Sequence, residues 1–286
     1  MAQDSKQLGD SMTNRVITAL VGLPIVIILV SLGGLWLRGG LLALSVLGLS
    51  EFYRALSGKG QNQQDSQDSI ERKALHFVGY FFSFLYFLLI VDSGIHEHFI
   101  ILIAGFILLN LMLTVVFFQK IEFKDFLITI CGFFYVTFLL SFIYLVRDAN
   151  IYFVWLIFTS ASASDTFAYF IGSKWGRHKL HGTPSPKKTW EGCVGGVLGA
   201  ALVGFLYGQA VINFVGIDHP IVLHSMAVSA VGAVFSQFGD LFASAIKRSV
   251  GIKDFGKVLP GHGGVLDRFD SIMVTAPGIY MVLILL

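Results

Sequence analysis

The stretch FLITICGFFYVTFLLSFIYLV, residues Phe126–Val146, contains 21 residues and no charged side chain. An α-helix of about 20 apolar residues crosses the hydrocarbon core of a bilayer, because each residue adds about 1.5 Å along the axis. The backbone N–H and C=O groups find no water in that core, and a helix satisfies them internally. The stretch therefore predicts a transmembrane helix.

Comparable apolar runs recur along all 286 residues. Only 13% of the residues are charged and 55% are hydrophobic, whereas soluble domains usually carry about 25% charged residues. We therefore expect an all-α integral membrane protein, a polytopic bundle of about nine transmembrane helices. The expected spans are Val16–Leu37, Gly40–Leu56, Leu75–Val91, Phe99–Phe118, Phe126–Val146, Ile151–Ser173, Cys193–Gly216, Val222–Phe242 and Ser271–Leu286. The glycine pairs Gly33-Gly34 and Gly39-Gly40 leave the boundary between the first two spans open.

The positions of the basic residues predict the orientation of the chain. With nine spans and a cytoplasmic N-terminus, 18 of the 20 Lys and Arg residues lie on the cytoplasmic side, and only Arg38 and Arg147 lie outside. Cytoplasmic loops carry such an excess of basic residues. We therefore expect the C-terminus outside. Residues 1–150 would form an N-terminal region of about five spans, and residues 151–286 a catalytic region of about four spans with two charged cytoplasmic loops.

The densest group of charges is SAIKRSVGIKDFGKVLPGHGGVLDRFD, residues Ser244–Asp270. Ionisable groups beside lipid are expensive, so such a group indicates function. Basic side chains suit phosphate and carboxylates suit a hard cation, which together predict metal-assisted phosphoryl chemistry. The candidate site residues in this segment and just before it are Asp240, Lys247, Arg248, Lys253, His262, Gly263, Gly264, Asp267, Arg268 and Asp270.

Three of these carboxylates, Asp240, Asp267 and Asp270, could hold Mg²⁺ and a nucleoside triphosphate together with the neighbouring cations. The two glycines Gly263-Gly264 permit close backbone approach and positive φ. Asp270 could equally form an ion pair with Arg268 or Arg248.

A second charged segment is KWGRHKLHGTPSPKKTWE, residues Lys174–Glu191. Thr189 could cap a helix that starts at the next residue, and the N-terminus of that helix would favour an anion. We therefore expect Lys187 and Lys188 to contact phosphate. The other basic residues, Lys174, Arg177 and Lys179, are equally explained by the ordinary excess of positive charge on the cytoplasmic side.

Two carboxylates stand inside apolar spans. Asp165, in SASASDTFAYF, needs a polar cavity or a partner, which makes it a candidate for substrate binding or for a helix-packing contact. Glu51 lies one turn from Arg54, and an ion pair between the two is the simplest interpretation.

These residues resemble a known family. The chain matches the signature of the phosphatidate cytidylyltransferases, also called CDP-diacylglycerol synthases, at Ser244, Lys247-Arg248, Lys253-Asp254, Pro260, His262-Gly263-Gly264, Asp267-Arg268 and Asp270. The segments SASDTFAYFIGSKWGRHKL and SPKKTWEG are similar to a second conserved region of that family.

The resemblance implies that CTP and phosphatidic acid are the substrates, and that CDP-diacylglycerol and pyrophosphate are the products. It implies Mg²⁺ held by Asp240 and Asp267, with a second, monovalent cation such as K⁺ nearby. It also implies a bacterial inner-membrane enzyme whose site faces the cytoplasm. The small-residue spans allow a homodimer, and nothing suggests nucleic-acid binding, because the basic residues follow membrane sidedness.

Three alternatives remain open from the sequence. A transporter would also carry buried charges, but here the charges gather on one face. A related CTP-using membrane enzyme, such as a polyprenol kinase or a cytidylyltransferase for archaeal ether lipids, would share much of the pattern. A purely structural membrane scaffold would have no need of this charge density.

Overall fold

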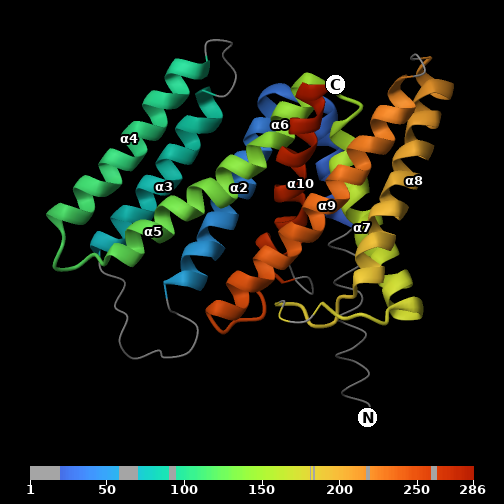
Figure 1. Ribbon diagram of the computed structural model, residues 1–286. Helices are drawn as coiled ribbons and strands as arrows, with labels where there is room; N and C mark the ends of the chain where they lie inside the picture. Colours follow the sequence, from blue (N-terminus) through green and yellow to red (C-terminus); the bar gives the residue numbers. More distant parts are fainter. Residues whose placement is uncertain are drawn as a thin grey trace, which may run out of the picture. The chain divides into compact units, whose positions relative to one another are not determined.

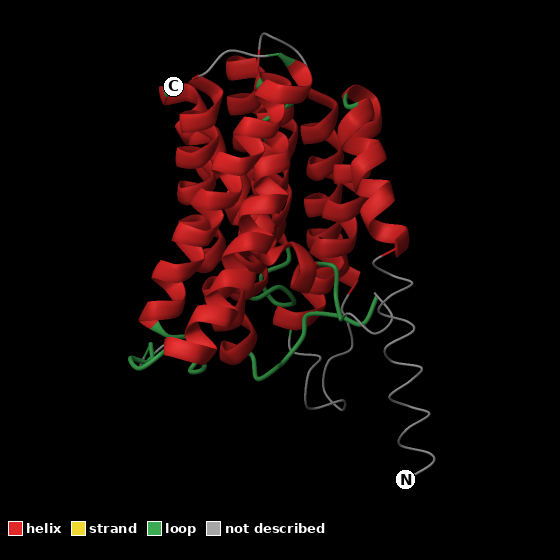
Figure 2. Ribbon diagram, turned by 90° about the vertical axis from the view of Figure 1, so that its right-hand side faces the viewer, coloured by secondary structure: helices red, strands yellow, loops and turns green. Residues whose placement is uncertain are grey.

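The computed structural model describes residues 20–57, 70–89, 95–180, 182, 184–216, 220–258 and 263–286. Within these ranges the secondary structure is helical, with short connecting loops and no strand (Figure 2). Six of the described helices are long and apolar enough to cross a membrane: Gly34–Leu56, His98–Val116, Phe123–Ala149, Trp190–Val215, Pro220–Ser249 and Leu266–Leu285. The protein is an all-α membrane protein. The count of nine spans and the orientation stay predictions.

The residues group into two compact units. The first unit comprises Met1–Ser141 and Val250–Arg268, and the second comprises Phe142–Ser249 and Phe269–Leu286. The division into an N-terminal region and a catalytic region concerns function, and it stays a prediction.

The first unit is built from a short apolar helix, Leu20–Leu32, and from the helices that follow it. These are α2 (Gly34–Leu56), α3 (Ile70–Leu89), α4 (Ile95–Val116), α5 (Phe123–Gly132) and the start of α6 (Leu139–Ala149), with a π-helical stretch at Phe133–Phe138. Figure 1 shows α3 and α4 side by side. The break before α2 falls at Gly33, where φ is 63°. Of the two glycine pairs that could mark the boundary between the first two expected spans, the structure has the break at Gly33-Gly34, and α2 continues through Gly39-Gly40.

Tyr53 fixes α2 against its neighbours in this unit. Its side chain is 2% exposed and lies against the Cα atoms of Gly79 in α3 and Gly132 in α5. A methyl group at Gly132 would approach Tyr53 Cε1 to 2.6 Å, closer than carbon atoms pack. The absence of a side chain at these two glycines therefore leaves space for the Tyr53 ring, whose packing there holds the C-terminal half of α2 in place.

The second unit contains α7 (Val154–Trp175), α8 (Trp190–Val215), α9 (Pro220–Ser249) and most of α10 (Leu266–Leu285). Figure 1 shows α7, α8 and α9 side by side. Glycines of α8 provide the close contacts: a Cβ at Gly196 would lie 2.8 Å from the carbonyl oxygen of Ser164 in α7. A Cβ at Gly204 would lie 2.5 Å from Cβ of Ser229 in α9. Small residues permit such approach where lipid gives no hydrophobic drive between helices.

Candidate functional site

In the first unit, the charged segment ends on a carboxylate that the backbone holds in place. Oδ2 of Asp267, in the first turn of α10, accepts hydrogen bonds from the N–H of Phe255 at 2.8 Å and of Gly264 at 3.1 Å. Both donors lie in the segment that precedes α10. These bonds orient the carboxylate and close the loop onto the start of α10.

Gly263 lies beside the same carboxylate. Its φ is 86°, and a Cβ there would lie 3.5 Å from Asp267 Oδ2 and 3.9 Å from Cγ of Asp254. A side chain at this position would be strained and would occupy the space between the two acids. The expected role of Gly263 in close backbone approach fits this geometry.

Glu51 contacts the backbone just before Asp267, a role that the sequence analysis did not predict. Its side chain is fully buried, and it accepts hydrogen bonds from the N–H groups of Val265 and Leu266. Both Glu51 oxygens thus bond to the backbone at the start of α10, in place of the ion pair with Arg54 that the sequence suggested. One signal was present in the sequence, since a carboxylate inside an apolar span needs a partner.

The remaining predicted residues of this unit differ in exposure. Lys253 and Arg268 have exposed side chains, and Gly264 is buried next to Glu51. His262 lies outside the described residues, so its role stays a prediction.

In the second unit, Lys188 and Asp240 form an ion pair. Lys188 Nζ lies 2.5 Å from Asp240 Oδ2, and the two side chains are 24% and 32% exposed. Asp165 in α7 interacts electrostatically with both of them. The structure thus brings together three predicted residues from α7, the α7–α8 loop and α9: one cation and two carboxylates. Lys187, by contrast, is exposed.

Gln237 joins the helices that carry this cluster, and it is a second residue to which the sequence analysis gave no role. Its Nε2 donates to Ser164 Oγ at 3.1 Å and to the carbonyl oxygen of Cys193 at 3.0 Å. Ser164 directly precedes Asp165, and Gln237 lies three residues before Asp240 in α9. These bonds therefore fix the spacing of α7, α8 and α9 beside the two carboxylates.

The loop before α8 folds back on itself. Lys179 and Thr189 form an antiparallel bridge, and the N–H of Trp190 donates to the carbonyl oxygen of His178 at 2.9 Å. Thr189 Oγ1 accepts the N–H of Gly192 at 3.2 Å, which confirms the predicted cap of α8. The fold-back carries Lys188 from the loop to Asp240.

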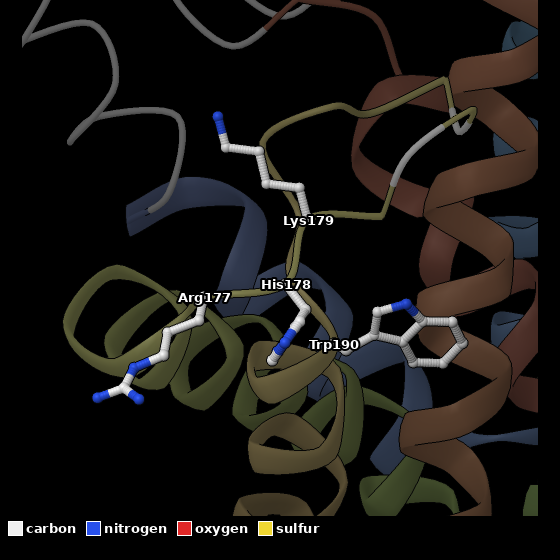
Figure 3. A pocket seen from close by; sticks show the side chains of 4 residues that line it. All are labelled: Arg177, His178, Lys179 and Trp190. Atoms are coloured by element: carbon white, nitrogen blue, oxygen red, sulfur yellow. The ribbon is translucent and has the colours of Figure 1, made fainter.

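A cavity of about 520 Å³ lies on this loop and is lined by Arg177, His178, Lys179 and Trp190 (Figure 3). The side chains of Arg177 and Lys179 point in different directions (Figure 3). The His178 side chain instead bonds to Glu191 in the first turn of α8, with Nδ1 2.6 Å from Oε1. The two basic residues do not converge on one point.

A second, mainly apolar cavity of about 570 Å³ lies next to the ion-paired cluster. Its lining includes Leu180, Trp190, Val194, Val197 and Phe238, together with Gln237. Such a lining suits a hydrocarbon chain, and the polar cluster lies close by, because Gln237 is also bonded to Ser164.

Asp270 also has a cation near it in this unit. Lys247 Nζ lies 4.0 Å from Asp270 Oδ2, and the Asp270 side chain is only 10% exposed. Backbone packing supports this end of α10, since a Cβ at Gly239 would lie 2.8 Å from the carbonyl oxygen of Asp270. The structure thus brings Lys247 to Asp270 from α9. Arg248 follows directly in the same helix turn.

The expected metal ligands fit Mg²⁺ by chemistry. Across the described ranges, no three His, Cys, Asp or Glu side chains form a metal-binding group. Mg²⁺ usually takes one or two carboxylates, with water and substrate phosphates completing its shell. Asp267 presents a carboxylate oriented by two N–H donors, and Asp240 presents one beside a cation. The two belong to different units, so their shared use at one ion stays a prediction.

Comparison with known proteins settles the family. A sequence model described as the cytidylyltransferase family matches residues 13–286. The chain belongs to the cytidylyltransferase family. The match covers every predicted site residue, from Asp165 to Asp270, and it confirms the resemblance found in the charged segments.

Several curated members of the family are similar to the chain. A phosphatidate cytidylyltransferase of Thermotoga maritima is 42% identical over 149 residues, which are 52% of this chain and 55% of that protein. One of Staphylococcus saprophyticus is 35% identical over 181 residues, 63% of this chain and 66% of that protein. One of Staphylococcus haemolyticus is 36% identical over 180 residues, with the same two shares. The chain thus spans between about half and two thirds of the length of these relatives.

Proposed function

We propose that the protein is a CTP:phosphatidate cytidylyltransferase of phospholipid biosynthesis. A phosphate oxygen of phosphatidic acid attacks the α-phosphorus of CTP and forms the new P–O bond. The bond from the α-phosphorus to the oxygen that bridges it to the β-phosphorus breaks, and pyrophosphate leaves with that oxygen. The products are CDP-diacylglycerol and pyrophosphate. Membership of the cytidylyltransferase family and the names of the relatives support this reaction.

The observation that carries the proposal is the geometry of Asp267. The family's signature segment folds so that two backbone N–H groups hold one oxygen of this carboxylate. Phosphoryl transfer depends on alignment and charge stabilisation more than on covalent chemistry. A carboxylate held this firmly suits a group that must present a fixed negative charge.

The reaction brings two anions together, CTP and phosphatidic acid, so basic residues are needed to neutralise the phosphates of both substrates. We propose that Lys187 and Lys188 contact phosphate from the α7–α8 loop, and that Lys247, Arg248, Lys253 and Arg268 do so from the signature segment. An arginine can hold the lipid phosphate with two parallel N–H···O bonds, which a lysine cannot. Asp165, His262, Gly263, Gly264 and Asp270 complete the proposed site.

We further propose that Asp240 and Asp267 hold Mg²⁺, with a monovalent cation such as K⁺ nearby. Such a metal neutralises phosphate oxygens as negative charge develops on them. Lys188 already neutralises Asp240.

The apolar cavity beside Gln237 supports a lipid acceptor, because its lining suits an acyl chain. With the predicted orientation, the site would face the cytoplasm of a bacterial cell, where CTP is available. The protein would then reside in the bacterial inner membrane.

The test uses purified protein in detergent–lipid micelles with CTP radiolabelled at the α-phosphate, phosphatidic acid and Mg²⁺. We expect label in the lipid phase and none when EDTA removes the divalent cation. Labelled lipid that forms equally well with EDTA would contradict the metal assignment. No label from protein shown to be folded would contradict the acceptor. An ether-linked phosphatidate analogue and a polyprenol with γ-labelled CTP would then identify the related enzymes.

A further inference from the structure

Glu51 is the buried carboxylate of the first unit that the proposed reaction does not use. It lies in α2, with no exposed surface. Burying an ionised carboxylate is strongly unfavourable unless hydrogen bonds compensate for the lost water. The hydrogen bonds that offset the cost of burying Glu51 therefore show which part of the chain this residue positions.

Both oxygens of Glu51 accept backbone N–H groups at the start of α10. Oε1 accepts from Val265 at 3.0 Å, and Oε2 accepts from Leu266, the first residue of α10, at 2.9 Å. The first N–H groups of a helix lack partners within the helix, and the helix dipole favours a negative charge there. Glu51 thus caps α10 from a helix more than 200 residues earlier in the sequence.

The loop approaches Glu51 so closely that two glycines are needed. A Cβ at Gly264 would lie 2.6 Å from Glu51 Oε2, and a Cβ at Gly256 would overlap with Oε1. The backbone therefore packs directly on the carboxylate at both ends of the loop between these glycines.

The same backbone holds Asp267. The N–H of Gly264 bonds to Asp267, and the next two N–H groups, of Val265 and Leu266, bond to Glu51. The second donor to Asp267 is Phe255, the neighbour of Gly256. Three consecutive amides are thus divided between the two carboxylates, and a shift of Glu51 would shift both donors of Asp267.

We propose that Glu51 is a positioning residue that sets the geometry of Asp267, and through it the affinity for the divalent cation. This inference rests on the proposed function only for its second part. The first part, that Glu51 holds the backbone donors of Asp267, concerns the fold and can be tested without substrate.

The test variant is Glu51→Gln, which keeps the volume but replaces one acceptor oxygen with an NH₂ group that faces an N–H. The matched control is Asp125→Asn. Asp125 is also buried in the first unit, at 3% exposure, and it pairs with Arg72, not with the loop. Both variants remove one buried carboxylate charge, so a general loss of stability affects both.

The first measurement is amide hydrogen exchange of the full chain in micelles, without metal or nucleotide. We expect Glu51→Gln to exchange about tenfold faster in the peptide covering residues 254–267, since a hydrogen bond to a charged acceptor is lost. Asp125→Asn should leave that peptide unchanged. Equal exchange of this peptide in wild type and Glu51→Gln would overturn the proposal.

The second measurement is the Mg²⁺ concentration that gives half the maximal rate. Glu51→Gln should raise it by about tenfold to a hundredfold, the usual effect of removing a group that orients a metal ligand, whereas Asp125→Asn should not. If wild type has no activity, the proposed reaction fails while the exchange result still decides the positioning role. If Glu51→Gln does not fold, Gly256→Ala replaces it, because its methyl group displaces the same carboxylate without changing charge. Wild-type exchange in Gly256→Ala would overturn the proposal.

Discussion

Replacing Asp267 with asparagine separates the two roles that we give this carboxylate. In the structure one oxygen, Oδ2, accepts both N–H groups, from Phe255 at 2.8 Å and from Gly264 at 3.1 Å. An amide oxygen can accept the same two bonds. Asp267→Asn therefore keeps the contacts of the loop but loses the negative charge offered to a cation.

The effect on stability follows from these two bonds. A hydrogen bond to a charged group contributes about 1.5–3 kcal/mol, and one between neutral groups about 0.5–1.5 kcal/mol. Weakening two bonds by about 1 kcal/mol each lowers the free energy of unfolding by about 2 kcal/mol in Asp267→Asn. Asp267→Ala leaves both N–H groups unsatisfied, at about 1–3 kcal/mol each, and should lower it by up to about 6 kcal/mol.

The effect on activity should be equal in the two variants. Removing one electrostatic group that stabilises a transition state lowers kcat by about 10²–10³. The assays are lipid labelling from radiolabelled CTP and denaturant unfolding in mixed micelles. Wild-type turnover by Asp267→Asn would refute the metal-binding role. Equal loss of stability in both variants would refute the assigned hydrogen bonds.

Three other changes test the second unit. Lys188→Met should raise the KM for CTP about tenfold or more, since the removed charge would neutralise phosphate. The unfolding midpoint should hardly change, because the partly exposed ion pair of Lys188 with Asp240 contributes only about 0–1 kcal/mol. Gly196→Ala should lower the free energy of unfolding by about 1–3 kcal/mol, because its methyl group would lie 2.8 Å from a backbone oxygen of α7. The control is Gly105→Ala in α4, which should not destabilise the protein, because the nearest atom to its methyl group would be 3.8 Å away. Thr189→Ala removes the cap of α8 and should cost about 1 kcal/mol; unchanged unfolding would contradict the capping bond.

The helical fold could be predicted because apolar length alone decides it in a membrane. Each described helix overlaps one of the expected apolar runs, and the helical segment Phe123–Ala149 contains the uncharged run Phe126–Val146. Helix ends were less predictable. Hydropathy placed the start of the last span at Ser271, but α10 begins at Leu266, because the Glu51 carboxylate accepts the N–H groups of Val265 and Leu266 at the start of the helix. Charge ends a hydrophobic segment without ending a helix.

The candidate site could be predicted where its signal is local. Thr189 followed by Trp190 predicted a cap, and the structure has it. The pair of Lys188 with Asp240 joins residues 52 positions apart, and no pattern within either segment specifies it. The contact of Glu51 with Val265 spans 214 positions. In the sequence, the one sign of this contact is a carboxylate inside an apolar span, and that sign does not identify the partner residue.

The distance along the chain between Glu51 and its partners has a consequence for biosynthesis. Glu51 is synthesised 214 residues before Val265, so at about 5–20 residues per second it waits roughly 10–40 s for the N–H groups that accommodate its charge. Until then the carboxylate lacks these donors and has to stay hydrated. Pulse-chase turnover of chains stopped after Ser249 would show whether such intermediates are degraded faster than the full chain. Helix α10, synthesised more than 200 residues after Glu51, is thus the element that completes the burial of this α2 residue.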